Sequence, residues 1–173
     1  KALEVERPPS VIWRIAAIPV LSYALVAFLG LVSYNSADVS AISAPANERP
    51  TNWMGLFGAW NAYGVFLLMG LCAYLVPVLF FVTGLLMAIG KRLRLRVLWM
   101  LLAALSCCAL MQFANAFAAP LLSVPQLNIA ANAGGGIGFL LNDKLFSVWL
   151  GNAGSAAFFG VLLAVSIVMI IGP

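Results

Sequence analysis

The sequence predicts an all-α membrane protein with four transmembrane helices and short amphipathic segments on the outer face before helices 2 and 4. Hydrophobic residues make up 64% of the 173 residues and charged residues only 8%, whereas a soluble domain has about 25% charged residues. The mean hydropathy is +1.07. The apolar residues gather in four stretches, each of which is long enough to cross a bilayer.

The positions of the spans follow from bilayer thickness, because about 20 apolar residues in a helix cross roughly 30 Å of hydrocarbon. We predict spans at residues 15–32, 65–89, 97–118 and 150–171. The first contains Pro19 near its start, which neighbouring helices can accommodate. Residues 1–14 then form an amino-terminal cytoplasmic flank, and residues 15–173 form one transmembrane domain.

The basic residues predict the orientation of the chain, since Lys and Arg near the ends of spans are retained on the cytoplasmic side. The short connection between spans two and three holds Lys91, Arg92, Arg94 and Arg96. With three more in the amino-terminal flank, seven basic residues lie on one side and two on the other. We therefore expect both termini in the cytoplasm, the two long loops outside, and contact between the basic turn and anionic lipid.

The segment "NWMGLFGAWNAYG", residues 52–64, combines glycines with aromatic residues before the second span. Its aromatic side chains suit a membrane surface, where a ring keeps its body in lipid and its polar edge in water. These side chains are Trp53, Trp60 and Tyr63. Gly55 and Gly58 permit a tight turn or the close approach of a helix. The alternative interpretation is a plain loop with interfacial aromatic residues.

A similar segment, residues 134–154, precedes the fourth span. Its expected polar side consists of Asn142, Asp143 and Lys144, and its lipid side of Phe146 and Trp149. Gly134 with Gly138, and Gly151 with Ser155, have the spacing of small residues that pack helices together. The two halves of the chain thus look like a repeated helix hairpin whose outer connection dips back to the membrane.

The sequence contains few of the residues that usually carry out catalysis or bind metal ions. There is no histidine, which is the commonest general base and metal ligand. Cys72, Cys107 and Cys108 lie within predicted spans without a CxxC spacing, so we predict small buried apolar residues. The segment "GLLMAIGKR", residues 84–92, departs from a phosphate-binding Walker A loop in its glycine spacing and in the Arg after its Lys. We expect no cofactor and no metal.

Gln112, Asn115 and Pro77 are polar or helix-breaking residues within the predicted spans that are candidates for a function. Gln112 and Asn115 are three residues apart and share a helix face, where an amide can bond to another helix. Without a charged partner in the spans, they favour helix packing over a substrate site. Pro77 removes a backbone hydrogen bond in mid-span and is expected to kink the second helix, either for structure or to shape a groove for a partner.

Four short motifs, in order, resemble the amino-terminal four-span membrane domain of the FtsK/SpoIIIE family of bacterial DNA translocases. They are "SYNSADVS" after the first span, "NWMGLFGAW" before the second, "LLMGLCAYLVPV" within it, and "GGGIGFLLN" before the fourth. The third carries the family's Gly-x-x-Ala-Tyr-x-x-Pro pattern at Gly70, Ala73, Tyr74 and Pro77. The resemblance extends from Ile12 to Gly172.

The resemblance implies a tether in the inner membrane at the division septum rather than an enzyme. In the family, this domain anchors a hexameric, ATP-driven DNA pump, and DNA is bound only by a cytoplasmic motor, whose linker would begin near the position of Pro173. The implied partners are the lipid bilayer, further copies of the chain and other cell-division membrane proteins. Candidate residues for helix packing or oligomerisation are Gly55, Gly58, Gly70, Tyr74, Pro77, Gly134, Gly138, Gly151 and Gly154.

Two alternatives stay open from the sequence. A small four-span transporter or channel would use Pro77 to mark a discontinuous helix and the glycine-rich segments as re-entrant elements. The scarcity of charged residues within the spans argues against ion-coupled transport. An accessory subunit of a larger membrane complex fits the composition equally well.

Overall fold

The computed structural model describes residues 11–91, 93–123 and 132–172. Four helical stretches in these residues are long and apolar enough to cross a membrane, which confirms the predicted fold class. The longer helices are α1 (Val11–Val32), α2 (Gly55–Met69), α3 (Leu75–Ala88), α4 (Arg94–Met111), α5 (Asn115–Leu122) and α7 (Ser147–Ile171). The shorter elements are the 3₁₀ helices η1 (Ser36–Asp38), η2 (Gly70–Tyr74) and η3 (Gln112–Ala114), the helix α6 (Gly135–Gly138) and the π-helix η4 (Phe139–Phe146).

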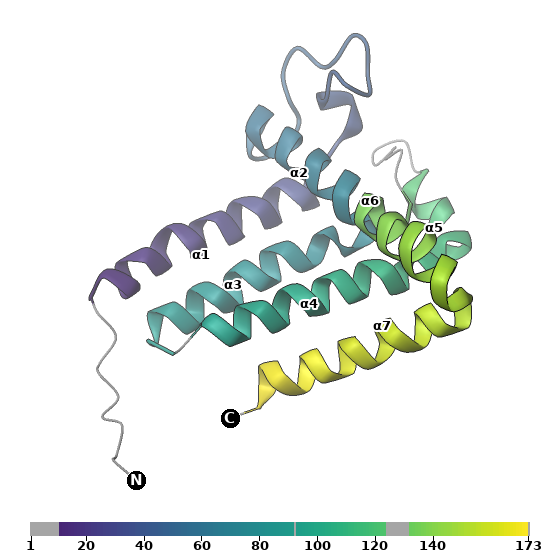
Figure 1. The fold of residues 1–173 in the computed structure, drawn as a ribbon. Helices are drawn as coiled ribbons and strands as arrows, with labels where there is room; N and C mark the ends of the chain where they lie inside the picture. Colours follow the sequence, from purple (N-terminus) through teal and green to yellow (C-terminus); the bar gives the residue numbers. More distant parts are fainter. Residues whose placement is uncertain (1–10, 92, 124–131, 173) are drawn as a thin grey trace.

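The long helices form two pairs, α1 with α3 and α4 with α7, and all four lie side by side (Figure 1). The start of α1, the turn between α3 and α4, and the end of α7 lie at one end of the bundle. The loop between α1 and α2 lies away from that end, beyond α2. We call the end with the α3–α4 turn the basic end and the other the outer end.

Small residues bring α1 and α3 together. The buried face of α1 includes Ala17, Ala24 and Ala27, and a Cβ atom at Gly84 of α3 would lie 2.7 Å from Leu21 Cγ. Helices in lipid gain little from hydrophobic attraction and associate through such close packing. Further contact comes from Tyr23 and Phe80, whose ring centroids lie 4.6 Å apart.

The second and fourth membrane-crossing stretches are broken at equivalent places. Each begins at a glycine with a positive φ angle, Gly55 (62°) or Gly135 (64°). Each is interrupted at a second such glycine, Gly70 (56°) or Gly151 (67°). Residues with a Cβ rarely adopt these angles, which glycine reaches easily. The order of elements in the two halves of the chain therefore agrees with the predicted repeat.

The predicted second span, residues 65–89, needs correction because it is not one helix. The helix α2 ends at Met69, since Gly70, with φ 56° and ψ −133°, cannot continue it. Pro77 lies in the first turn of α3, where a missing backbone N–H costs no helical hydrogen bond. The helix is therefore interrupted at Gly70 rather than kinked at Pro77, as was predicted.

The other helices extend past their predicted boundaries. The helix α1 begins at Val11 rather than residue 15, α4 and α5 cover residues 94–122 rather than 97–118, and α7 begins at Ser147 rather than residue 150. The helix starts are extended by interfacial or basic residues such as Trp13, Arg94 and Trp149, and α5 is extended by further small and apolar residues. The predicted ends at Val32 and Ile171 agree with the structure, whereas the predicted starts lie too late in the sequence.

The segments before the breaks differ from the predicted amphipathic pattern. On α2 the exposed side chains include the large apolar residues Phe57 and Trp60, and the buried residues Ala59, Ala62 and Phe66 are apolar as well. The two faces are thus both largely apolar. In the second segment the expected sides are partly reversed, and the contacts described in the next subsection give the reason.

Glycines that face a backbone carbonyl should tolerate no added methyl group. A Cβ at Gly138 would overlap the carbonyl oxygen of Cys108, whereas a Cβ at Gly160 would have no neighbour within 4 Å. We expect Gly138→Ala to lower stability by about 1–3 kcal/mol because neither backbone can yield easily. Gly160→Ala is the matched control, which should leave the thermal unfolding midpoint unchanged or raise it. Equal midpoints for the two variants in detergent would contradict this packing.

Candidate functional site

The loop between α1 and α2, residues 33–54, folds around a buried carboxylate, and we call it the outer cap. Asp38 is only 1% exposed. Its oxygens accept hydrogen bonds from Asn47 Nδ2 at 2.7 Å, from the Asn52 backbone N–H at 2.9 Å, and from the Thr51 backbone N–H and hydroxyl at 3.0 Å. A single side chain therefore holds both ends of the loop together.

These contacts also set the acidity of the Asp38 carboxyl group. Burial by itself raises its pKa, but the hydrogen bonds from Thr51, Asn47 and Asn52 together lower the pKa below the ordinary value of 3.8. Hydrogen bonds to the charged form of a carboxylate favour that form. Asp38 is therefore ionised at neutral pH, as a buried acceptor for this set of donors requires.

Asn52 connects the outer cap to two helices. Its Nδ2 donates to the carbonyl oxygens of Gly30 at 2.8 Å and Ser33 at 3.2 Å, at the end of α1. Its Oδ1 accepts from the Met54 backbone N–H at 2.9 Å, at the start of α2. Because the first N–H and last carbonyl groups of a helix lack partners within it, these bonds satisfy both helix ends.

Gly58 leaves the room that this arrangement needs, since a Cβ there would overlap the Asn52 side chain. The motifs "SYNSADVS" and "NWMGLFGAW" thus form one structure, with Asp38 and Asn52 at its centre. Both motifs were recognised in the sequence, but neither Asp38 nor Asn52 was predicted to be a site residue. The available signal was an acidic residue in a loop that begins directly after an apolar span.

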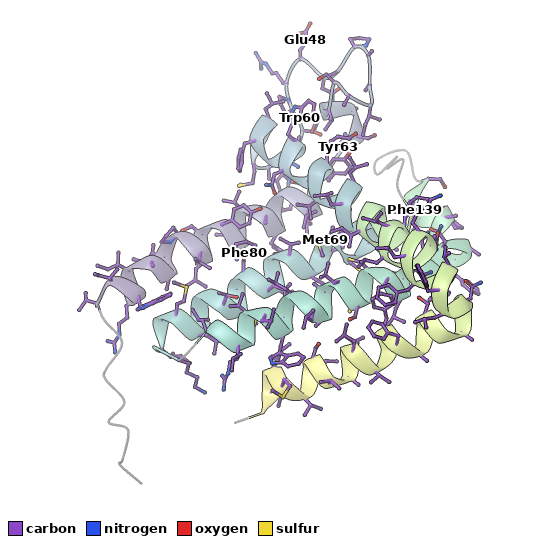
Figure 2. The ribbon with its side chains drawn as sticks, in the orientation of Figure 1. Glu48, Trp60, Tyr63, Met69, Phe80 and Phe139 are labelled. Carbon is purple, nitrogen blue, oxygen red and sulfur yellow. The ribbon has the colours of Figure 1, made fainter. Side chains whose placement is uncertain are left out.

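The second feature is a close contact between the two broken helices, which we call the glycine crossing and which consists of Gly70, Gly134, Gly135 and Gly138 with their facing backbone. Gly70 and Gly135 lie against each other, so that a Cβ on either would overlap backbone atoms of the other half of the chain. The Leu71 backbone N–H donates to the Ala133 carbonyl oxygen at 2.9 Å across the same contact. In Figure 2, Met69 marks where α2 ends, near α6.

Gly134 and Gly138 pack α6 onto α4, because a Cβ on either would overlap the Cys108 carbonyl oxygen. Their predicted small-residue spacing is therefore used inside this chain. Gly55 and Gly151 have no atom within 4 Å of an added Cβ, and Gly154 meets only Leu150 of its own helix. A role for any of these glycines in oligomers stays a prediction.

Two further residues from the predicted set lie beside the crossing. Tyr74 is 41% exposed, and its ring centroid lies 5.6 Å from that of Phe66 in an edge-to-face contact. Pro77 is buried at the start of α3. Cys72 and Cys108 are buried and Cys107 is half-buried, and all three are free thiols, in line with their predicted role as small apolar residues.

A polar cluster, consisting of Gln112, Asn142, Asp143, Ser147 and Ser155, joins η3, η4 and α7. Gln112 Nε2 donates to Asp143 Oδ2 at 2.7 Å, and Asn142 Nδ2 donates to Asp143 Oδ1 at 3.1 Å. The hydroxyls of Ser155 and Ser147 donate to Asn142 Oδ1 at 2.5 and 3.1 Å. Gln112 thus bonds to another helix, as predicted, but its partner is the carboxylate of Asp143, whereas the sequence predicted no charged partner.

The cluster corrects the predicted polar and lipid sides of residues 142–149. Asn142 is only 2% exposed, because it turns inward to Ser155 rather than to water. Phe146 is half-buried and stacks on Phe158 of α7, with ring centroids 4.7 Å apart. Lys144 is exposed, and Trp149 is 84% exposed, as predicted. The spacing of a π-helix differs from that of an α-helix, so helical periodicity misplaced these side chains.

The second amide singled out from the sequence, Asn115, also bonds outside its own helix. Its Oδ1 accepts from the Ala133 backbone N–H at 2.7 Å. The Ala133 peptide segment is thus held on one side by Asn115 and on the other by Leu71. Asn115 therefore supports the glycine crossing.

The basic end carries the residues predicted to set the topology. Lys91 is exposed in the turn after α3, and Arg96 of α4 donates from Nη2 to the Gly172 carbonyl oxygen at 3.4 Å. Arg94 begins α4, and Arg92 lies outside the described residues. Among the described residues, no group of three or more His, Cys, Asp or Glu side chains is placed to hold a metal ion.

Four apolar helical stretches, paired about a glycine crossing and closed by an outer cap, define a multi-pass α-helical membrane domain. The family model described as the 4TM region of DNA translocase FtsK/SpoIIIE matches residues 12–173. The chain therefore belongs to this family and comprises its four-span membrane region. No curated protein and no solved structure gave a significant match.

The buried Asp38 carboxylate makes the outer cap sensitive to pH and to mutation. Because the folded pKa lies below 3.8, its stabilisation is complete above that pH and is lost as the pH falls through the folded value. Asp38→Ala should cost about 1–3 kcal/mol, since it leaves several donors unpaired. It should also speed hydrogen exchange at the Thr51 and Asn52 amides.

The matched control is Glu48→Ala, because Glu48 is exposed at the tip of the same loop (Figure 2). This variant should leave amide exchange in the outer cap unchanged. Unaltered exchange at Thr51 and Asn52 in Asp38→Ala would show that the carboxylate does not hold the loop.

Proposed function

We propose that this chain is the membrane anchor, oligomerisation and divisome-targeting domain of a bacterial DNA translocase that couples chromosome segregation to cell division. The observation that carries the proposal is the family match over residues 12–173. Within this proposal the chain itself performs no catalysis. DNA is moved by an ATP-driven motor that belongs to the full-length protein.

The geometry supports an anchor that holds a motor on one side of the membrane. The start of α1 and the end of α7 lie at the same end of the bundle (Figure 1). Lys91 and Arg96 lie at this end too, and basic residues favour the cytoplasmic side. In the proposed orientation both termini are cytoplasmic, in the inner membrane at the septum, and a motor attached after α7 faces the chromosome.

The outer end supports a different part of the proposal, the recruitment to other division proteins. The outer cap has a fixed conformation around Asp38 and Asn52, and its tip at Glu48 projects away from the helices (Figure 2). A rigid loop loses little conformational freedom when a partner binds. We place contacts with other division membrane proteins at the outer cap. We place the contacts between copies of the chain, in a proposed hexamer, along the exposed helix faces.

A fluorescent reporter tests orientation and targeting in one experiment. We expect a green fluorescent protein fused after Pro173 to be bright, because it folds in the cytoplasm, and to gather in a band at midcell. The same reporter inserted after Pro45, in the exposed part of the outer cap, should be dark after export through the general secretory route. Alkaline phosphatase at the two positions should give the opposite pattern.

The two parts of the proposal fail in distinguishable ways. A bright reporter at Pro45 and a dark one at Pro173 would invert the orientation. A bright reporter at Pro173 that spreads evenly around the cell would preserve the orientation but contradict targeting by this domain. Glu48→Ala serves as the matched variant for the tip of the outer cap, and a loss of the midcell band would place partner contacts there.

A further inference from the structure

An open apolar groove runs between α4 and α7 towards the basic end. It has a volume of about 450 Å³. The side chains that line it are Trp99, Ala157, Phe158, Val161, Leu162 and Val165. Several remain exposed although they form a hollow rather than a smooth helix face, including Val161 at 65%. The groove is thus suited to a slender apolar occupant.

A cation lies where the groove approaches the basic end. Arg96 precedes Trp99 by three residues on α4, so the two side chains share a helix face. The contact between Arg96 Nη2 and the Gly172 carbonyl oxygen shows that this face is turned towards α7. A guanidinium group has five N–H donors, so this one contact leaves donors for an anion.

We propose that the groove between α4 and α7 binds one acyl chain of an anionic phospholipid whose phosphate group is held by Arg96. The occupant comes from the leaflet on the basic side of the membrane. Basic pockets between transmembrane helices on that side bind anionic headgroups. The site needs only the membrane-spanning helices and goes beyond the proposed anchoring function.

Charge favours a lipid over a second copy of the chain as the occupant. Copies in one membrane share their orientation, so a neighbour's basic turn would lie at the same depth as Arg96. Among the residues that the structure describes, the acidic side chains are Asp38 and Glu48 of the outer cap and Asp143 of η4, so none of these three could neutralise those charges. A phospholipid supplies both an apolar chain for the groove and an anion for Arg96.

Native mass spectrometry of the protein in a mild detergent tests the site with two lipids of identical acyl chains. We expect the protein to retain one phosphatidylglycerol in preference to phosphatidylcholine. Arg96→Gln should lower the retained phosphatidylglycerol by about fivefold, because one basic contact is lost. Val161→Trp should fill the groove and reduce retention to the phosphatidylcholine level while leaving Arg96 in place.

Matched variants distinguish lipid binding at this site from a general attraction between anionic lipids and the basic end. Lys91→Gln removes one charge from the same basic end, and Ile167→Trp introduces the same side chain at an exposed position of α7 outside the groove lining. Both should retain lipid like the unaltered protein. Equal effects of Arg96→Gln and Lys91→Gln, or equal retention of the two lipids, would overturn the proposal. A Val161→Trp variant that changes the oligomeric state but not lipid retention would assign the groove to a second copy instead.

Discussion

The glycine crossing is the contact on which the rest of the structure depends. Gly70 ends α2 and Gly135 begins the second broken helix, and each lies where a side chain would meet the backbone of the other. The Leu71 N–H pairs with the Ala133 carbonyl oxygen across this contact, and Asn115 accepts from the Ala133 N–H. Because backbone hydrogen bonds in lipid must be satisfied within the protein, a helix can break here only if the other half of the chain supplies the partners.

The outer cap and the polar cluster likewise provide hydrogen-bond partners within the protein at the outer end. Asp38 and Asn52 satisfy the loop and the ends of α1 and α2, while Gln112, Asn142 and Asp143 connect η3 to the π-helix and α7. These polar residues lie where helices end or break. The basic end needs little of this, and its charges are free to face lipid headgroups.

Much of the fold could be predicted because the hydrophobic stretches and the Lys and Arg residues act locally. Four spans and the gathering of Lys91, Arg94 and Arg96 at one end follow from composition and position alone. The break at Gly70 could not be placed, because an apolar run around Gly70 looks the same whether the helix continues or stops. The inward turn of Asn142 and the stacking of Phe146 on Phe158 were missed for a related reason, since a π-helix changes which residues share a face. Asp38 and Asn52 were within the quoted motifs, but their shared hydrogen bonds join positions that local patterns do not connect.

The most direct test of the central contact is the free energy of unfolding of Gly70→Ala, compared with Gly64→Ala. Both positions lie on the second membrane-crossing stretch, but a Cβ at Gly64 has no neighbour within 4 Å, whereas one at Gly70 would overlap Ala133 and force a residue with a side chain to φ 56°. We expect a loss of about 3 kcal/mol or more for Gly70→Ala and no loss for Gly64→Ala, measured by denaturant titration in micelles. Two variants of equal stability would show that the halves of the chain do not depend on this crossing.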